Sequence, residues 1–272
     1  MTAGGSSSTE KGLRDGLSEL GYIEGTSIVI DWRRSLGTDE ELRSLASQLA
    51  GAKVELIVAF GTPAARAVMQ ATKIPVVFIV GDPVGTGLAS SLARPGGQST
   101  GVSMLMPQMV SKRLELLRQV APGIRRIVFL MNSSNPLNVP VLEEAQRAAR
   151  TLVVELITSD ARNADELDAA FRAMPRSATV ALVVSPDLLS FKNKTKLAEA
   201  VRKAKLAAIF PFKEFHDDGA LMSYGADNRD AAHKVAVYVD KILKALSILF
   251  LNDLLVSSLR SHVWWLLRRI FR

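Results

Sequence analysis

Polar residues and prolines that could shape a small-molecule site recur in this sequence where short apolar runs give way to predicted helices. They are Thr62 and Pro63, Asp82 and Pro83, Asn132, Ser134 and Asn135, and Ser185 with Asp187. If these apolar runs are parallel strands, the loops that follow them lie at the carboxyl edge of a sheet, where ligands of open α/β proteins bind. Free N–H groups at the helix starts suit a carboxylate or a phosphate. An acid such as Asp82, Asp187 or Asp227 suits an ammonium group, so the set would recognise both ends of an amino acid.

Each of these residues also has an ordinary structural explanation. Thr, Asn and Asp are common helix caps, and proline after Thr62 or Asn135 is common at the first helical position. No single loop is specific for a ligand. The recurrence of such loops at successive strand ends is what favours a binding site.

Signals for catalysis and for cofactors are weak. Residues 97–101 read Gly-Gln-Ser-Thr-Gly, the letters of a nucleophile elbow, but a loop precedes Ser99 and a predicted strand follows it, which is the reverse of the required order. A hydrolase that uses Ser99 is therefore an alternative for a serine-reactive probe to test. The histidines lack metal-ligand spacing and the chain has no cysteine, so we expect no metal and no cofactor.

The charge of the chain does not indicate a nucleic-acid partner. The 272 residues include 34 Lys and Arg against 27 Asp and Glu, a formal charge of +7. Residues 245–272 hold Arg260, Arg268, Arg269 and Arg272 against Asp253, so nearly half of the excess lies in this last segment. The rest of the chain lacks the basic cluster with interleaved aromatic residues that binds nucleic acids.

The elements that must position the polar loops alternate along the chain. Apolar runs predict strands at 28–30, 54–60, 75–80, 127–131, 152–157, 180–184, 207–210 and 221–224, with helical patterns between most of them. Continuous apolar strands that alternate with helices indicate an α/β fold with doubly wound parallel sheets. We expect one lobe at 1–105, continued by 226–245, a second lobe at 106–225, and an atypical tail at 246–272. A ligand cleft is expected between the lobes.

Several segments together resemble a known family. They are 12–25 (GLRDGLSELGYIEG), 61–65 (GTPAA), 75–78 (PVVF), 81–88 (GDPVGTGL), 94–97 (RPGG), 132–136 (NSSNP), 219–227 (GALMSYGAD) and 238–244 (YVDKILK). In this order they are similar to the ABC-transporter substrate-binding proteins of the type I periplasmic-binding-protein group, which includes tryptophan- and tyrosine-binding members. The resemblance covers about residues 12–244.

This resemblance implies a bacterial two-lobed receptor that closes on a small ligand and delivers it to an ABC permease in the membrane. It implies in addition that the protein is not an enzyme. The ligand would be an amino acid or a related carboxylate, with aromatic ones included. Position by position, Thr62, Pro63, Asp82 and Pro83 would bind it from lobe one. Asn132, Ser134, Asn135, Ser185 and Asp187 would bind it from lobe two, with Asp227 as a further candidate. The implied location is periplasmic.

Both ends of the chain depart from the family pattern. Met1 to Lys11 are polar, which predicts neither a signal peptide nor the first strand of lobe one, so the chain as given would stay in the cytoplasm. In the tail, Asn252, Asp253 and Arg260 interrupt the apolar residues and exclude a membrane-spanning helix. We expect either an interfacial helix that touches the membrane surface or a segment of altered reading frame.

Two other readings stay open at this stage. The same two-lobed fold serves as the effector-binding module of transcriptional regulators. That reading predicts an N-terminal helix-turn-helix, which Met1 to Lys11 cannot supply. The other is a truncated receptor fragment that binds nothing.

Overall fold

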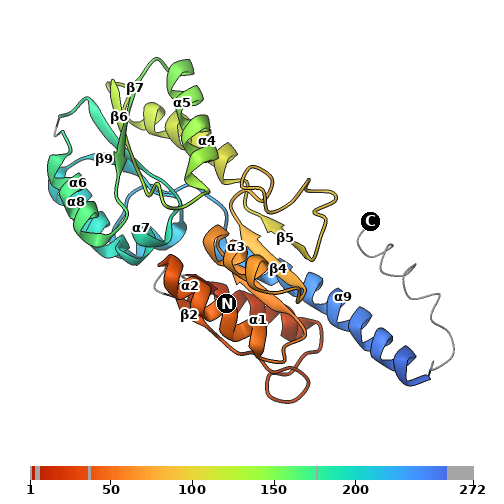
Figure 1. Ribbon diagram of the computed structural model, residues 1–272. Coiled ribbons are helices and arrows are strands. Elements are labelled where there is room, and N and C mark those ends of the chain that lie inside the picture. The colour runs from red at the N-terminus through yellow and green to blue at the C-terminus, as the bar shows by residue number, and fades with distance from the viewer. Residues whose placement is uncertain (1, 4–6, 36–37, 176, 256–272) are drawn as a thin grey trace. The chain divides into compact units, whose positions relative to one another are not determined.

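The structure, a computed structural model, describes residues 2–3, 7–35, 38–175 and 177–255 (Figure 1). The chain folds into two compact units. Unit 1 takes the chain as far as Ser103 and resumes at Asn228, and unit 2 is Met104–Asp227. The sequence placed these boundaries at 105 and 225.

Unit 1 contains a five-stranded parallel sheet with the strand order β2-β1-β3-β4-β5. The strands are β1 (Thr2–Ala3), β2 (Arg34–Ser35), β3 (Ile57–Phe60), β4 (Val76–Val80) and β5 (Ser99–Ser103). The helices are α1 (Ser7–Glu19), α2 (Asp39–Gly51), α3 (Thr62–Ala71) and α9 (Asn228–Leu255). All residues of β4 are buried, as expected of a central strand that is covered on both faces.

The structure corrects the expectation that the first strand of this sheet is missing. Thr2 and Ala3 pair with Arg34 and Ser35 on one side, and Thr2 pairs with Phe60 on the other. Strand pairing uses backbone N–H and C=O groups, so a short polar segment can occupy this position without an apolar run.

The strand predicted at 28–30 is wrong. Ile28 makes only an isolated bridge with Glu24, in a turn closed by the Gly25 N–H donating to Ile28 O at 2.8 Å. Val29 is 86% exposed, so no neighbouring layer buries this apolar run. The strand that pairs with β1 is instead β2, a few residues later in the sequence.

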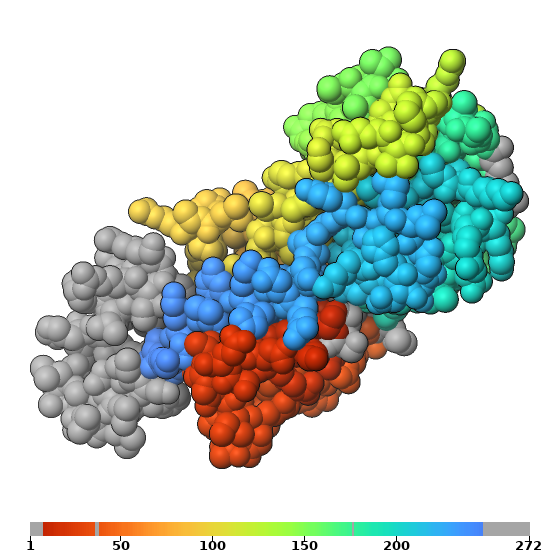
Figure 2. All heavy atoms as spheres, turned by 180° about the vertical axis from the view of Figure 1, so that it is seen from behind, coloured from red at the N-terminus to blue at the C-terminus, as the bar shows by residue number. Residues whose placement is uncertain are grey.

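The first and last helices of unit 1 pack directly against each other. A Cβ atom at Gly12 would lie 2.2 Å from Arg229 O, and one at Gly16 would lie 2.6 Å from His233 O, so only glycine permits this approach. Tyr22 Oη also donates to Asp240 Oδ1 at 3.0 Å. Figure 2 shows the red N-terminal segment beside the blue C-terminal helix.

The C-terminal helix is longer than the sequence pattern predicted. It continues through the expected end near Lys244 as far as Leu255. The remainder of the predicted tail, 256–272, lies outside the described residues. None of the helices in the described part of the chain has the length and apolar content that a membrane-crossing segment requires.

Unit 2 contains a four-stranded parallel sheet with the order β7-β6-β8-β9. Its strands are β6 (Arg126–Met131), β7 (Glu155–Asp160), β8 (Val180–Val184) and β9 (Ala207–Ile209). Its helices are α4 (Met106–Val120), α5 (Asn138–Thr151), α6 (Ala164–Ala173), α7 (Leu188–Lys192) and α8 (Lys194–Ala204), with a 3-10 helix, η1 (Lys213–Asp218). The predicted strand at 221–224 makes only an isolated bridge between Ser223 and Phe210.

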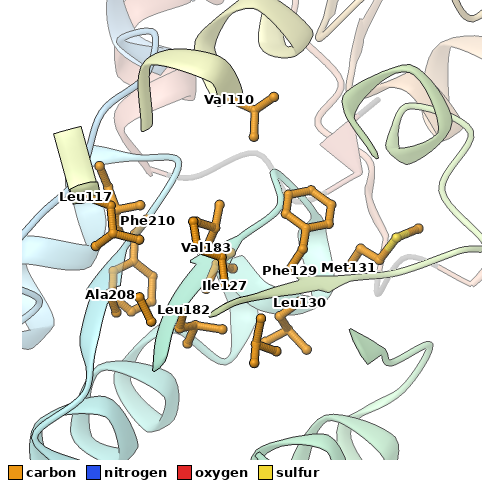
Figure 3. Packing of buried hydrophobic residues seen from close by; sticks show 14 of the residues in the cluster. Val110, Leu117, Ile127, Phe129, Leu130, Met131, Leu182, Val183, Ala208 and Phe210 are labelled. Atoms are coloured by element: carbon orange, nitrogen blue, oxygen red, sulfur yellow. The ribbon is translucent and has the colours of Figure 1, made fainter. Parts of the chain in front are cut away.

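The core of unit 2 lies on both faces of this sheet. Figure 3 shows Phe129 on the side of Val110 from α4, and Leu130 and Leu182 on the opposite side. Successive strand residues point to opposite faces, so a run in which both are apolar is buried only when both faces are covered. These helix layers fix the carboxyl ends of β6 and β8, where the predicted ligand residues begin.

Candidate ligand-binding loops

In unit 1 the turn from β3 into α3 depends on a glycine. Gly61 has φ 91° and ψ 146°, a conformation that other residues rarely adopt. Its N–H donates to Ile79 O at 2.8 Å, and its carbonyl accepts the first N–H bond of α3, from Ala65 at 3.0 Å. The helix therefore begins at Thr62 with Gly61 as its N-cap, and Pro63 lies in the first turn. The sequence had suggested Thr62 itself as the cap, but its side chain makes no capping hydrogen bond.

Thr62 is unusual because its hydroxyl is buried without a partner. The residue is 2% exposed, and its Oγ1 atom makes no hydrogen bond. A buried hydroxyl normally finds a donor or acceptor, since leaving one unsatisfied costs about 1–3 kcal/mol. The α3 N-terminus thus offers a hydroxyl together with the positive end of a helix dipole.

The second predicted loop of unit 1 follows β4 and is closed on itself. The half-buried Asp82 accepts the Gly85 N–H through Oδ1 at 2.9 Å, and its main-chain oxygen accepts the Thr86 hydroxyl. Pro83 O accepts the Leu88 N–H at 2.8 Å. A Cβ atom at Gly85 would lie 2.2 Å from Asp82 Oδ2, so glycine is needed for this carboxylate to fold over the turn.

In unit 2 the loop from β6 into α5 is built from asparagine side chains. Asn132 Oδ1 accepts the Ser134 N–H at 3.0 Å, and Asn132 O accepts the Asn135 N–H at 3.1 Å. Asn135 Oδ1 in turn accepts the Leu137 N–H at 3.1 Å. Asn132 is half-buried and Ser134 is exposed, whereas Asn135 is buried.

Asp187, at the end of β8, joins this loop to the next one. Its Oδ1 accepts Asn132 Nδ2 at 3.2 Å, and its Oδ2 accepts Asn135 Nδ2 at 2.8 Å. Oδ1 also accepts the Leu189 N–H at 2.8 Å and so caps α7. Burial raises the pKa of the Asp187 carboxyl above its usual value near 3.8, while the bonds from Asn135, Leu189 and Asn132 act in the opposite direction.

The structure brings further residues into this cluster that the sequence pattern did not single out. The fully buried Asn138 donates through Nδ2 to Asn132 O at 2.8 Å and accepts the Ser185 hydroxyl at its Oδ1. Asp160 accepts Ser133 N–H at 2.8 Å and Ser133 Oγ at 2.6 Å. Asn138 is the first residue of α5, and Asp160 is the last residue of β7, beyond the strand predicted at 152–157. Their positions at the end of a helix and of a strand are the signal that could have found them.

Asp227 lies at the end of unit 2 and forms an ion pair with Lys213 Nζ at 2.5 Å. Lys213 follows β9, not β6 or β8. The structure therefore brings Asn132, Ser134, Asn135, Ser185 and Asp187 together at the ends of β6 and β8, and connects Asp227 to a different loop.

Ser99 does not have the setting of a nucleophile. It is the first residue of β5, paired with Val76, rather than part of a turn from a strand into a helix. Its buried hydroxyl has no hydrogen-bond partner, and so no base. Among the residues that the structure describes, no three His, Asp or Glu side chains gather as a metal site.

Two parallel α/β units, each with polar loops at the carboxyl ends of its strands, define a binding protein of the type I periplasmic kind. The family model for ABC transporter substrate binding proteins matches residues 3–249 of this chain. The chain belongs to this family, which is a class of solute-binding proteins and not a class of enzymes. The resemblance and the fold class predicted from the sequence are confirmed.

Individual relatives agree with this assignment. A tyrosine-binding protein of Clostridioides difficile is 27% identical over 252 residues, which are 92% of this chain and 71% of the relative. The structure of a conserved domain protein from Vibrio cholerae is 27% identical with a TM-score of 0.83, covering 89% of this chain and 83% of the other. An ABC domain in complex with L-Trp from Streptococcus pneumoniae is 26% identical with a TM-score of 0.81 and the same coverage.

Proposed function

We propose that this protein is the solute receptor of an ABC importer and binds an amino acid or a related small carboxylate, aromatic ones included. The tyrosine-binding relative and the structural relative in complex with L-Trp support this ligand class. Its partner would be a membrane permease, and it would act on the outer side of that membrane. Its own role would be binding and release, without chemistry on the ligand.

The observation that carries this proposal is the unpartnered hydroxyl of Thr62. A ligand oxygen placed at the α3 N-terminus would receive the Thr62 hydroxyl and the helix dipole together, so a carboxylate fits best. Pro63 leaves the first turn without its own N–H group and shapes the same end of the helix. The loop with Asp82 and Pro83 follows the neighbouring strand β4 and would contribute the second contact of unit 1.

In unit 2 the candidate residues differ in exposure, which separates those that would contact the ligand from those that would support them. Asn132 and Ser134, which are half-buried and exposed, would contact the ligand. Asn135, Ser185 and Asp187 are buried and bonded to one another's loops, so they would hold those contacts in place. Asp227 is a candidate partner for a ligand ammonium group.

Thermal unfolding with a panel of amino acids and small acids tests the ligand class. One class in the panel should raise the melting temperature of the wild-type protein. A cooperative melt with no shift across the panel would overturn the receptor proposal as stated.

A matched pair of variants tests the Thr62 contact. Thr62→Val and Ser99→Ala each remove a buried hydroxyl of unit 1 that has no partner, so neither should lower the melting temperature without ligand. Thr62→Val should raise the ligand Kd by about tenfold or more, since one hydrogen bond to a charged group contributes about 1.5–3 kcal/mol. Ser99→Ala should leave Kd unchanged. Equal Kd values in calorimetric titrations of both variants would remove Thr62 from the site.

A further inference from the structure

Arg113, in the middle of α4, is a charged side chain in the core of unit 2. It is 0% exposed. Its Nε donates to Tyr224 O at 2.8 Å, one terminal nitrogen lies 3.7 Å from Met106 Sδ, and the other, Nη1, makes no hydrogen bond. Burial lowers the pKa of this guanidinium to about 9, and no carboxylate of the described residues acts on it.

Stability alone does not explain an arginine at this position. A buried charge without a counter-charge loses its hydration, and replacing such a group by an apolar residue of similar volume is often neutral or stabilising. The neighbouring core positions of α4, Val110, Leu114 and Leu117, are apolar. The cost of Arg113 is therefore more readily explained by what it contacts.

Both contacts of Arg113 lie next to the places where the chain passes from one unit to the other. Met106 is near the first passage, between Ser103 and Met104. Tyr224 is near the second passage, between Asp227 and Asn228. Met106 belongs to α4 itself, so it is the bond to Tyr224 O by which Arg113 joins α4, just after the first passage, to the segment just before the second.

The backbone of both segments is already closely constrained. Leu105 enters α4 with φ 48° and ψ 42°, a left-handed conformation that is costly for leucine. On the leaving segment, the Tyr224 N–H donates to Phe210 O at 3.0 Å, and a Cβ atom at Gly225 would lie 1.9 Å from Pro211 O. A link between two such segments transmits a shift of one to the other.

We propose that Arg113 is a positioning residue for ligand binding, which keeps the two connecting segments at a fixed spacing so that they shift together when the ligand binds. This inference rests on the proposed function and adds to it that ligand binding shifts the connecting segments. Since Nη1 has no acceptor, Arg113 can gain a hydrogen bond in the ligand-bound state without breaking its bond to Tyr224.

The test compares Arg113→Met with Arg118→Met. Arg118 lies on the same helix and also donates to a backbone carbonyl, Ile124 O at 2.9 Å. Its acceptor, however, lies far in sequence from both passages, unlike Tyr224. Arg113→Met should keep or raise the melting temperature without ligand, yet raise the ligand Kd by about tenfold. Arg118→Met should leave Kd unchanged, and Arg113→Lys, which keeps the charge and one bond, should lie between wild type and Arg113→Met. A purely structural role would instead lower stability and leave Kd alone.

Hydrogen exchange without ligand separates this proposal from the proposed function. In Arg113→Met, the amides of Tyr224 and Met109, which donate to Phe210 O and Leu105 O, should exchange about tenfold faster than in wild type, while those of β8 stay protected. Unchanged exchange at these amides, or unchanged Kd in Arg113→Met, overturns the role of Arg113. If wild type binds nothing in the panel, the receptor proposal fails, and the exchange result alone decides whether Arg113 couples the segments.

Discussion

The two units satisfy their strand-end polar groups very differently. In unit 2, the Asp187 carboxylate accepts Asn132, Asn135 and Leu189, so its oxygens are fully engaged within the protein. In unit 1, the Thr62 hydroxyl at the end of β3 has no partner at all. In unit 1 the loop after β4 is also closed by its own hydrogen bonds, so the contrast lies in the Thr62 hydroxyl after β3, which the protein leaves unsatisfied.

This difference teaches how a binding protein can divide the cost of recognition. Loops held by an internal network are ordered before the ligand arrives, so less conformational entropy is lost on binding. An unsatisfied buried hydroxyl instead raises the free energy of the empty protein and is relieved when a ligand oxygen arrives. Under the proposed function, unit 2 would therefore lower the entropy cost of ligand binding, and unit 1 would supply a favourable hydrogen bond to the ligand.

Breaking the network of unit 2 should have the largest effect. Asp187→Ala removes the cap of α7 and leaves the amides of Asn132 and Asn135 without their acceptor. We expect the free energy of unfolding to fall by about 3 kcal/mol, with ligand affinity falling as well. Urea unfolding and calorimetric titration would measure both.

Asp160→Ala is the matched control for this change. Asp160 is also a carboxylate at the end of a strand of unit 2, but it is exposed, and the hydrogen bonds shown for its side chain come from one residue, Ser133. Its loss should be clearly smaller. Equal losses of stability for the two variants would mean that Asp187 holds no wider network.

A pair of alanine variants, one from each unit, should show an intermediate effect. Asn135 is buried and bonded to Asp187 and Leu137, so Asn135→Ala should lower the free energy of unfolding by about 2 kcal/mol. Asp82 is half-buried and its side chain holds one amide, that of Gly85, so Asp82→Ala should lower it by about 1 kcal/mol or less. Melting curves without ligand would give the order, and the reverse order would contradict the contrast between the units.

The smallest effect concerns pH and the Asp187 carboxyl. Its pKa in the folded protein lies above its usual value near 3.8, so the folded state holds the proton more tightly than the unfolded state. The stability from this group is fully present below that value and is lost as pH rises through the folded-state pKa. Asp187→Asn, which keeps a helix cap, should remove this slope from a series of unfolding measurements across the same pH range. An identical slope in both proteins would assign it to another group.

Much of both sheets could be predicted from local sequence, because a strand buried on both faces is a continuous run of apolar residues. Strands β4 and β8 are runs of apolar residues that are buried throughout, and the loops that follow them begin with polar residues as predicted. The pairing of Thr2 and Ala3 leaves no such record, since it depends on backbone groups alone. Val29 shows the opposite error, because an apolar residue predicts burial only where a neighbouring layer exists.

The sequence predicted which loops carry the candidate site. It did not predict which of their residues contact a ligand and which support the others. The residue types at the strand ends indicated polar loops, and the structure joins Asn132, Asn135 and Asp187 by hydrogen bonds. Which of them face a ligand and which hold the others depends on burial, and burial depends on packing from distant segments. The role of Asn138 could not be predicted for this reason, because its contact is with the Ser185 hydroxyl, which is distant in sequence.

The close contact of α1 with α9 has a consequence for how the protein is made. Unit 2 is one continuous stretch of chain, Met104–Asp227, whereas unit 1 needs segments from both sides of it. During synthesis, Gly12 and Gly16 of α1 are made long before Arg229 and His233, whose backbone they pack against. Until then this face of α1 has no packing partner from α9. Unit 2 can therefore fold during translation, whereas the packing of α1 is completed only after α9 has been synthesised.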